Sequence, residues 1–208
     1  MPDGNKIAVL ISGGGTTLKN LIQWRTEQKL NAQIELVISN NPNAAGLDYA
    51  AEADIPHLVI SHKEFETISA FSNAIFSAIQ SANIDLVVMG GFLRRLAIPS
   101  AYENRVINIH PSLIPAFCGK GFYGQKVHQA VIDYGCKLSG CSVHYVDDQY
   151  DHGPIIAQET VPVKTTDTAE TLAKRVFEKE CEVYPTIINA IVKGNVVIKD
   201  RCVQISKP

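Results

Sequence analysis

Apolar residues in the first half of the chain fall into short runs, and between these runs they recur every three or four positions. Short apolar runs are typical of buried strands, whereas the wider spacing is typical of amphipathic helices. The expected strands are residues 6–12, 32–40, 56–60 and 85–91, and the expected helices are residues 16–28, 44–53 and 64–82. This alternation predicts a mostly parallel sheet with right-handed crossovers.

The second half of the chain has a different pattern. A strand over 106–110 is followed by a glycine-rich loop, a helix over 126–135 and two apolar segments typical of adjacent strands. The two segments are 138–147 and 154–163. A long helix is expected over 168–192, bent or broken at Pro185, and a terminal hairpin over 195–205. No linker or repeat interrupts the pattern, so we expect a single domain over residues 1–208.

Composition narrows the class of protein. Apolar residues make up 46 % of the chain, the net charge is −2, and no run of Lys or Arg stands out, which argues against a nucleic-acid partner. No apolar stretch approaches the roughly 18 residues of a membrane helix, and the N-terminus does not resemble a signal peptide. Five cysteines without a CxxC pair are typical of reduced thiols, so we expect a cytoplasmic protein.

The stretch SGGGTTL (12–18) lies between the first strand and the first helix. Glycines permit a tight turn there, and free N–H groups at a helix N-terminus bind anions. Thr16 and Thr17 add hydroxyl donors. The stretch is not a P-loop, because Leu18 precedes Lys19 where that motif needs a Gly-Lys pair. It is not GxGxxG either, because Leu18 stands at the position of the third glycine. A phosphate site and a plain tight turn are both open interpretations.

A second glycine pair, in MGGFLRRL (89–96), follows the strand at 85–91. Glycines at this place let a ligand approach the backbone, and Arg94 and Arg95 can pair with an anion. From spacing alone, two solvated arginines on a loop are the simpler interpretation.

Asn108 and His110 interrupt the apolar pattern of the strand at 106–110, and Pro111 ends it. Residues two apart in a strand point to the same face, so the amide and the imidazole project together. Such a pair can stabilise an oxyanion and move a proton. The alternative is a hydrogen-bonded core histidine beside a turn-forming asparagine.

Asp151 lies in a turn-forming stretch, YDHGP. If its carboxylate reaches His110, we expect it to orient the imidazole and raise its pKa, which would keep His110 cationic. His152 is expected at the surface, and His144 in the core or behind the site. The sequence has neither a GxSxG elbow nor paired metal-ligand spacing, so we expect no metal and no bound nicotinamide.

Three stretches together carry a family resemblance, and they follow one another over nearly the whole chain. They are VLISGGGTTL (9–18), NIHPSLIPAF (108–117) and GCSVHYVDDQYDHGPIIAQ (140–158). The sequence resembles the phosphoribosylglycinamide formyltransferase family of folate-dependent enzymes. The resemblance implies an α/β formyltransferase fold, with a mostly parallel twisted sheet, helices on both faces and a Rossmann-like N-terminal half.

The resemblance also implies a reaction and its residues. The formyl group of 10-formyltetrahydrofolate would pass to the amine of glycinamide ribonucleotide, in de novo purine biosynthesis, with these small molecules as substrates and neither nucleic acid nor membrane as a partner. The implied catalytic residues are Asn108, His110 and Asp151. The implied acceptor-binding residues are Gly15, Thr16 and Thr17 for the phosphate and Glu180 for the ribose. The implied folate-binding residues are Leu93, Arg94, Arg95, Leu96 and Asn108.

Several positions depart from the family pattern, and two of them concern the expected folate site. Some members carry an Arg near the start of the third helix that contacts the folate tail, and here Lys63 is the nearest cation. His152 replaces a small residue beside Asp151.

Three alternatives remain at this stage. A formyltetrahydrofolate deformylase usually has a second His where Pro111 stands, and an N-terminal regulatory domain. A methionyl-tRNA formyltransferase would need a C-terminal tRNA-binding domain. A non-catalytic folate- or nucleotide-binding module is the alternative from another class.

Overall fold

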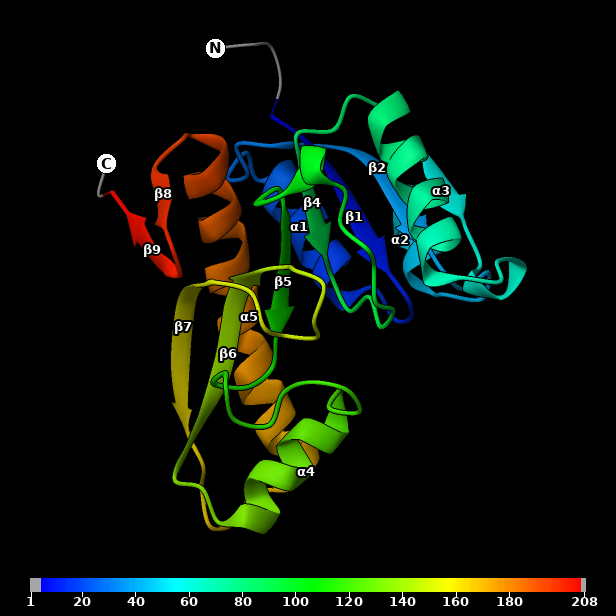
Figure 1. Cartoon of the computed structure of the whole chain (residues 1–208). Coiled ribbons are helices and arrows are strands. Elements are labelled where there is room, and N and C mark those ends of the chain that lie inside the picture. The colour runs from blue at the N-terminus through cyan, green and yellow to red at the C-terminus, as the bar shows by residue number, and fades with distance from the viewer. Residues whose placement is uncertain (1–4, 207–208) are drawn as a thin grey trace.

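The computed structural model describes residues 5–206. Its main sheet has seven strands in the order β3-β2-β1-β4-β5-β6-β7 (Figure 1). These strands are β1 (Lys6–Ile11), β2 (Gln33–Ser39), β3 (His57–Val59), β4 (Leu86–Met89), β5 (Val106–His110), β6 (Leu138–Tyr145) and β7 (Ile155–Pro162). The pairs from β3 to β5 are parallel, whereas β5–β6 and β6–β7 are antiparallel. The predicted mostly parallel α/β sheet is confirmed.

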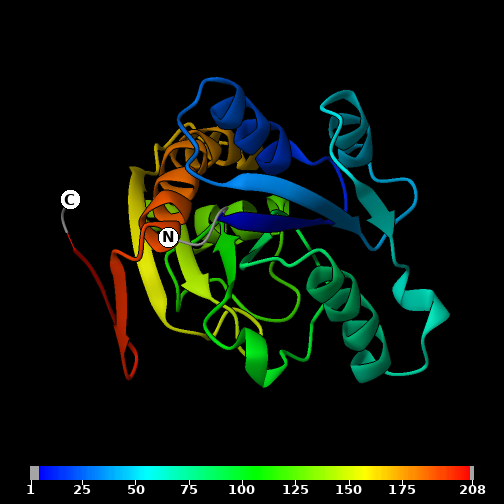
Figure 2. The same ribbon diagram turned by 90° about the horizontal axis from the view of Figure 1, so that it is seen from above.

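Helices cover both faces of the sheet, as predicted (Figure 2). They are α1 (Thr16–Thr26), α2 (Gly46–Glu52), α3 (Ile68–Ser81), α4 (Gln125–Tyr134) and α5 (Ala169–Val192), with 3-10 turns η1 (His62–Glu64) and η2 (Ser100–Tyr102). Alternate residues of β1 point to opposite faces. Val9 packs in the cluster formed with α1, α2, α4 and α5, and Leu10 in the cluster formed with α3.

Helix α3 begins four residues later than its apolar pattern suggests. The Thr67 hydroxyl accepts a hydrogen bond from the Ala70 N–H and caps the helix at that point. Residues 62–64 form η1 instead, where the Ser61 hydroxyl accepts from the Lys63 N–H.

Pro185 does not break α5, which runs without interruption from Ala169 to Val192. A proline cannot donate to the carbonyl four residues earlier, which is that of Cys181. The Asn20 side-chain amide, on α1, donates to this carbonyl at 3.0 Å. The expected break is therefore absent, and a tertiary contact satisfies the acceptor that the proline leaves free.

The predicted terminal hairpin is present as β8 (Val196–Lys199) and β9 (Cys202–Ile205), which pair antiparallel to each other and form a separate small sheet. The hairpin lies beside β7, so the C-terminal segment packs next to the antiparallel half of the main sheet (Figure 1).

Candidate active site

The two glycine loops predicted from the sequence meet at the carboxyl ends of β1 and β4. The Leu93 N–H donates to the Ser12 hydroxyl at 2.9 Å. A Cβ on Gly90 would lie 3.2 Å from Thr17 Cβ, so the absence of a side chain there lets the loop after β4 approach α1. Strand β1 lies between β2 and β4, where the strand order reverses, and ligands of open α/β sheets bind at this edge.

Asn108, His110 and Asp151 converge at the end of β5, the next strand along. Asn108 and His110 point to one side of the strand, as their spacing predicts. Asp151 Oδ2 lies 3.5 Å from His110 Nδ1, and the Asn108 Nδ2 donates to Asp151 Oδ1 at 3.5 Å. The loop between β6 and β7 carries Asp151 to this position because β6 returns antiparallel beside β5.

His144 is a fourth member of this cluster. It lies opposite Asn108 in the β5–β6 register and is buried. Its Nδ1 donates to the Tyr145 carbonyl at 2.8 Å, and its Nε2 lies 3.1 Å from the Asn108 Nδ2. The same Nε2 lies 3.7 Å from Asp151 Oδ1. The expectation of a supporting position is confirmed; the signal that could have found these contacts is the antiparallel register.

Backbone groups of the glycine-rich loop after β5 hold both ends of the His110–Asp151 pair. The Gly119 N–H donates to Asp151 Oδ2 at 2.8 Å, and His110 Nε2 donates to the Phe117 carbonyl at 2.9 Å. Asp151 itself has a left-handed backbone with φ of 51°. The turn geometry therefore directs the carboxylate inward, away from the solvent that a loop carboxylate usually meets.

The pKa of His110 differs from the sequence-based expectation. Burial lowers the pKa of His110, and it outweighs the Asp151 charge and the Phe117 carbonyl, which both raise it. Burial alone would raise the pKa of Asp151, but contacts with His144, His110 and Gly119 hold it below its ordinary value. The expectation that Asp151 raises the pKa of His110 above its ordinary value is therefore wrong for the free protein, because burial has the larger effect.

A small cavity of about 50 Å³ opens beside this cluster. Arg94, Arg95 and Leu96 line it together with Asn108 and Asp151, so the structure places most of the predicted folate-binding residues around one space. Leu93 is not among the lining residues; its side chain is exposed and its N–H is bonded to Ser12.

Lys63 and Arg94 lie near His62. Burial lowers the pKa of His62, and the charges of Arg94 and then Lys63 lower it further. Two cations thus gather at η1 and the loop after β4, at the place where the sequence lacks the Arg that some family members carry.

The glycine loop after β1 has a packing role at Gly15 and open space beside Gly13 and Gly14. Gly15, with φ of 67°, precedes α1, and a Cβ there would lie 2.4 Å from Gly46 Cα. A Cβ on Gly13 or Gly14 would meet nothing within 4 Å. Thr16 is exposed at the helix N-terminus. Gly15 is therefore needed for α1 to pack against α2, while the neighbouring positions border open space.

Glu180 lies on α5, one turn before Tyr184. The Tyr184 hydroxyl donates to the carbonyls of Met89, at the end of β4, and of Ile107, within β5. Burial raises the pKa of Glu180 to about 7, and among residues 5–206 no neighbouring charge or hydrogen bond opposes the effect.

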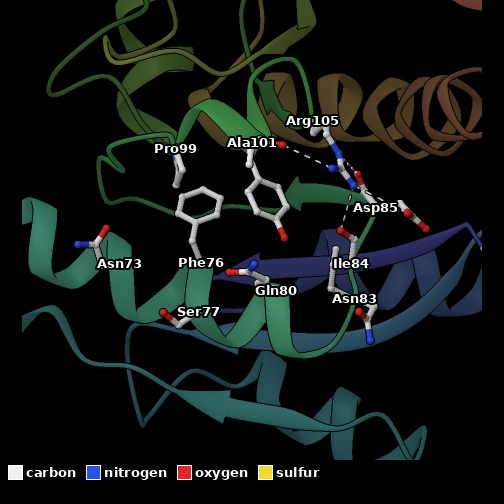
Figure 3. Close-up of a pocket in the computed structure, with 11 residues that line it drawn as sticks. Asn73, Phe76, Ser77, Gln80, Asn83, Ile84, Asp85, Pro99, Ala101 and Arg105 are labelled. Carbon is white, nitrogen blue, oxygen red and sulfur yellow. Dashed lines mark hydrogen bonds and ion pairs between the residues drawn. The ribbon is translucent and has the colours of Figure 1, made fainter.

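A larger cavity, of about 660 Å³, lies near the amino ends of β4 and β5, between α3 and η2 (Figure 3). None of the predicted site residues lines it. Arg105 donates to the carbonyls of Asp85, Ala101 and Ile84, so its guanidinium is already occupied by the protein. The smaller cavity, which borders the reactive groups, is the candidate site.

Over residues 5–206 no group of three or more His, Cys, Asp or Glu is placed to hold a metal ion. No helix in the same range is long and apolar enough to cross a membrane.

The fold and the site define an α/β protein with an amide, an imidazole and a carboxylate at a strand end, near a glycine-rich loop that precedes a helix. A family model described as formyl transferase matches residues 5–188, and the chain belongs to this family.

Named relatives agree with that assignment. The bovine (Bos taurus) trifunctional purine biosynthetic protein adenosine-3 is 41 % identical over 94 % of this chain, which spans only 19 % of that protein. The Arabidopsis thaliana chloroplastic phosphoribosylglycinamide formyltransferase is 35 % identical over 94 % of this chain and 68 % of its own. The crystal structure of glycinamide ribonucleotide transformylase 1 from Symbiobacterium toebii superposes with a TM-score of 0.93 at 35 % identity, covering 100 % of this chain and 96 % of that one.

Proposed function

We propose that this protein transfers the formyl group of 10-formyltetrahydrofolate to the amine of glycinamide ribonucleotide, in de novo purine biosynthesis. The observation that carries the proposal is the convergence of Asn108, His110 and Asp151 at the end of β5, beside a cavity that Arg94 and Arg95 line. The names of the relatives support this choice of donor and acceptor.

In the proposed reaction, the acceptor amine attacks the formyl carbon, and the carbonyl oxygen becomes an oxyanion. The Asn108 amide has two hydrogens, of which one is bonded to His144 at 3.1 Å. The other faces Asp151 Oδ1 across 3.5 Å, at the limit of a hydrogen bond, so this hydrogen is available to the oxyanion.

Because burial lowers the pKa of His110, we assign its positive charge to the reaction itself. The attacking nitrogen becomes acidic as its bond to carbon forms, and His110 accepts that proton, directly or through a water molecule. The resulting imidazolium stabilises the oxyanion while Asp151 stabilises the imidazolium. When the bond to N10 of the folate breaks, the proton passes to the departing nitrogen, which balances the reaction.

The substrate-binding residues follow from their places around the same edge. Gly15, Thr16 and Thr17 would hold the acceptor's phosphate at the N-terminus of α1, and Glu180 its ribose hydroxyls. Leu93, Arg94, Arg95 and Leu96, with Asn108, would hold the folate. Residues 1–208 would act as one domain.

An assay with 10-formyltetrahydrofolate, run with and without glycinamide ribonucleotide, tests the function. We expect formyl transfer only when the ribonucleotide is present. Formyl loss without it would instead favour a deformylase, against which Pro111 argues. Binding of both substrates without turnover would favour a non-catalytic module.

The proposal includes no metal and no nicotinamide. We expect exhaustive chelation to leave kcat at its original value, since the chemistry assigned to Asn108, His110 and Asp151 needs only proton transfer and hydrogen bonding. Activity that is lost on chelation and restored by a single metal ion would contradict this prediction.

We also propose a cytoplasmic location, with small molecules as partners and neither nucleic acid nor membrane. The five cysteines, all free in the structure, support a reducing compartment.

A further inference from the structure

The loop that carries Asp151 is closed at its base by the main chain. The Tyr145 N–H donates to the Pro154 carbonyl at 2.9 Å. A Cβ on Gly153 would lie only 1.9 Å from the Tyr145 carbonyl oxygen, so a glycine is needed for the two ends to approach. Between these ends, residues 146–153 carry Asp151, and contacts made to this loop help to set the direction of its carboxylate.

One such contact crosses the loop. Asp147 Oδ1 accepts from the Gln149 N–H at 2.8 Å, and Asp147 Oδ2 lies 2.6 Å from His152 Nδ1. Both ring and carboxylate are partly exposed, at 46 % and 36 %. Because His152 directly follows Asp151, this pair connects the residue next to Asp151 with the start of the loop.

A second contact comes from the C-terminal hairpin. The guanidinium of Arg201, in the turn between β8 and β9, donates to the His152 carbonyl at 2.6 Å. The family match ends at residue 188, before this hairpin begins. The carbonyl that Arg201 binds belongs to the residue directly after Asp151, whose backbone is held in the left-handed region.

We propose that Arg201 is a positioning residue for Asp151, and that it acts together with the His152–Asp147 pair. The hairpin thereby becomes part of the apparatus that directs the carboxylate at His110 and Gly119. This inference rests on the proposed function for its kinetic consequences, but its structural consequence can be measured without turnover.

The structural readout is the amide proton of Gly119, which is bonded to Asp151 Oδ2. In Arg201→Ala, we expect its NMR signal to move upfield and its hydrogen exchange to quicken, because the carboxylate is held less firmly. The matched control is Lys199→Ala, which removes an exposed cation from the same hairpin. The control should leave the Gly119 signal where it is.

The kinetic readout is the split between kcat and KM. Arg201→Ala should lower kcat roughly three- to tenfold, the effect of losing one typical hydrogen bond, and leave the KM for glycinamide ribonucleotide unchanged. A Gly119 signal that matches the wild type in Arg201→Ala overturns the proposal, even if the variant is less stable to heat. The two proposals can fail separately. If the wild-type protein transfers no formyl group, but the Gly119 signal differs between the wild type and Arg201→Ala, the proposed function is refuted and the positioning role is supported.

Discussion

Asp151 Oδ2 lies 3.5 Å from His110 Nδ1, and both side chains are almost fully buried. The two residues come from different parts of the chain, one at the end of β5 and the other in the loop after β6. Burial nevertheless outweighs the carboxylate charge and keeps the pKa of His110 lowered in the free protein.

Replacing Asp151 with Asn tests this pairing. The carboxylate raises the pKa of His110 against the larger effect of burial, so the variant should show a still lower His110 pKa in an NMR titration. We expect kcat to fall by roughly two orders of magnitude or more with small changes in KM, because the charge is needed mainly in the transition state.

Asp148→Asn is the matched control, since Asp148 lies exposed in the same loop. It should leave both the His110 titration and kcat unchanged. An Asp151→Asn variant that titrates and turns over like the wild type would return Asp151 to the status of an ordinary turn residue.

The glycine loop after β1 allows packing and binding to be separated. From the sequence alone, substitution of Gly15 is expected to weaken binding of the acceptor, glycinamide ribonucleotide, and to leave folate binding almost unchanged. The structure adds that a Cβ there meets Gly46 Cα at 2.4 Å, so Gly15→Ala should lower the free energy of unfolding by roughly 1–3 kcal/mol.

Gly14→Ala and Thr16→Val should behave differently from Gly15→Ala. A Cβ added at Gly14 would meet nothing within 4 Å, and Thr16 is exposed, so both variants should unfold like the wild type. Each should raise the KM for glycinamide ribonucleotide about tenfold, the effect of one lost or obstructed phosphate hydrogen bond, and spare the KM for the folate. Equal losses for both substrates would argue against a phosphate site here.

His128 should make the protein sensitive to acid. It is buried on α4, its Nδ1 has no hydrogen-bond partner among residues 5–206, and burial followed by the His110 charge lowers its pKa to about 4. Between about pH 6.5 and pH 4 the unfolded chain binds a proton at this residue that the folded chain does not. The free energy of unfolding should therefore fall as the pH falls through this range.

The expected size of this loss is on the order of 2 kcal/mol, after allowance for partial solvent access. Urea unfolding at pH 7 and at pH 5 measures it. In His128→Leu the dependence on pH should be shallower by this amount, because the titrating group is gone. An identical slope in the two proteins would show that the acid sensitivity arises elsewhere.

Asn20 and Pro185 should show energetic coupling. Asn20→Ala leaves the Cys181 carbonyl without its donor and should lower the free energy of unfolding by about 1 kcal/mol or more. In a Pro185→Ala background, the new N–H at position 185 can donate to the same carbonyl, so Asn20→Ala should have a much smaller effect. Thermal unfolding of the four proteins completes this double-mutant cycle, and additive effects would contradict the proposed contact.

Local sequence pattern was sufficient for the elements and for part of the site. Apolar runs such as 85–91 mark strands because parallel strands are buried on both faces, and the alternation of strands with amphipathic helices restricts the topology. The spacing of Asn108 and His110 places both side chains on one face of β5, a consequence of strand geometry alone. The resemblance carried by NIHPS and the stretch around Asp151 indicated the family, which the family match confirms.

Only the tertiary structure decided what depends on distance and on exclusion of water. The antiparallel register of β5 and β6 brings His144 to Asn108, and no local pattern encodes that register. The pKa of His110 is lowered because burial outweighs one nearby charge, a balance that needs the packed surroundings. Gly15 meets Gly46, Asn20 satisfies the carbonyl that Pro185 leaves free, and Arg201 reaches the residue after Asp151, because folding joins segments that are far apart in the chain.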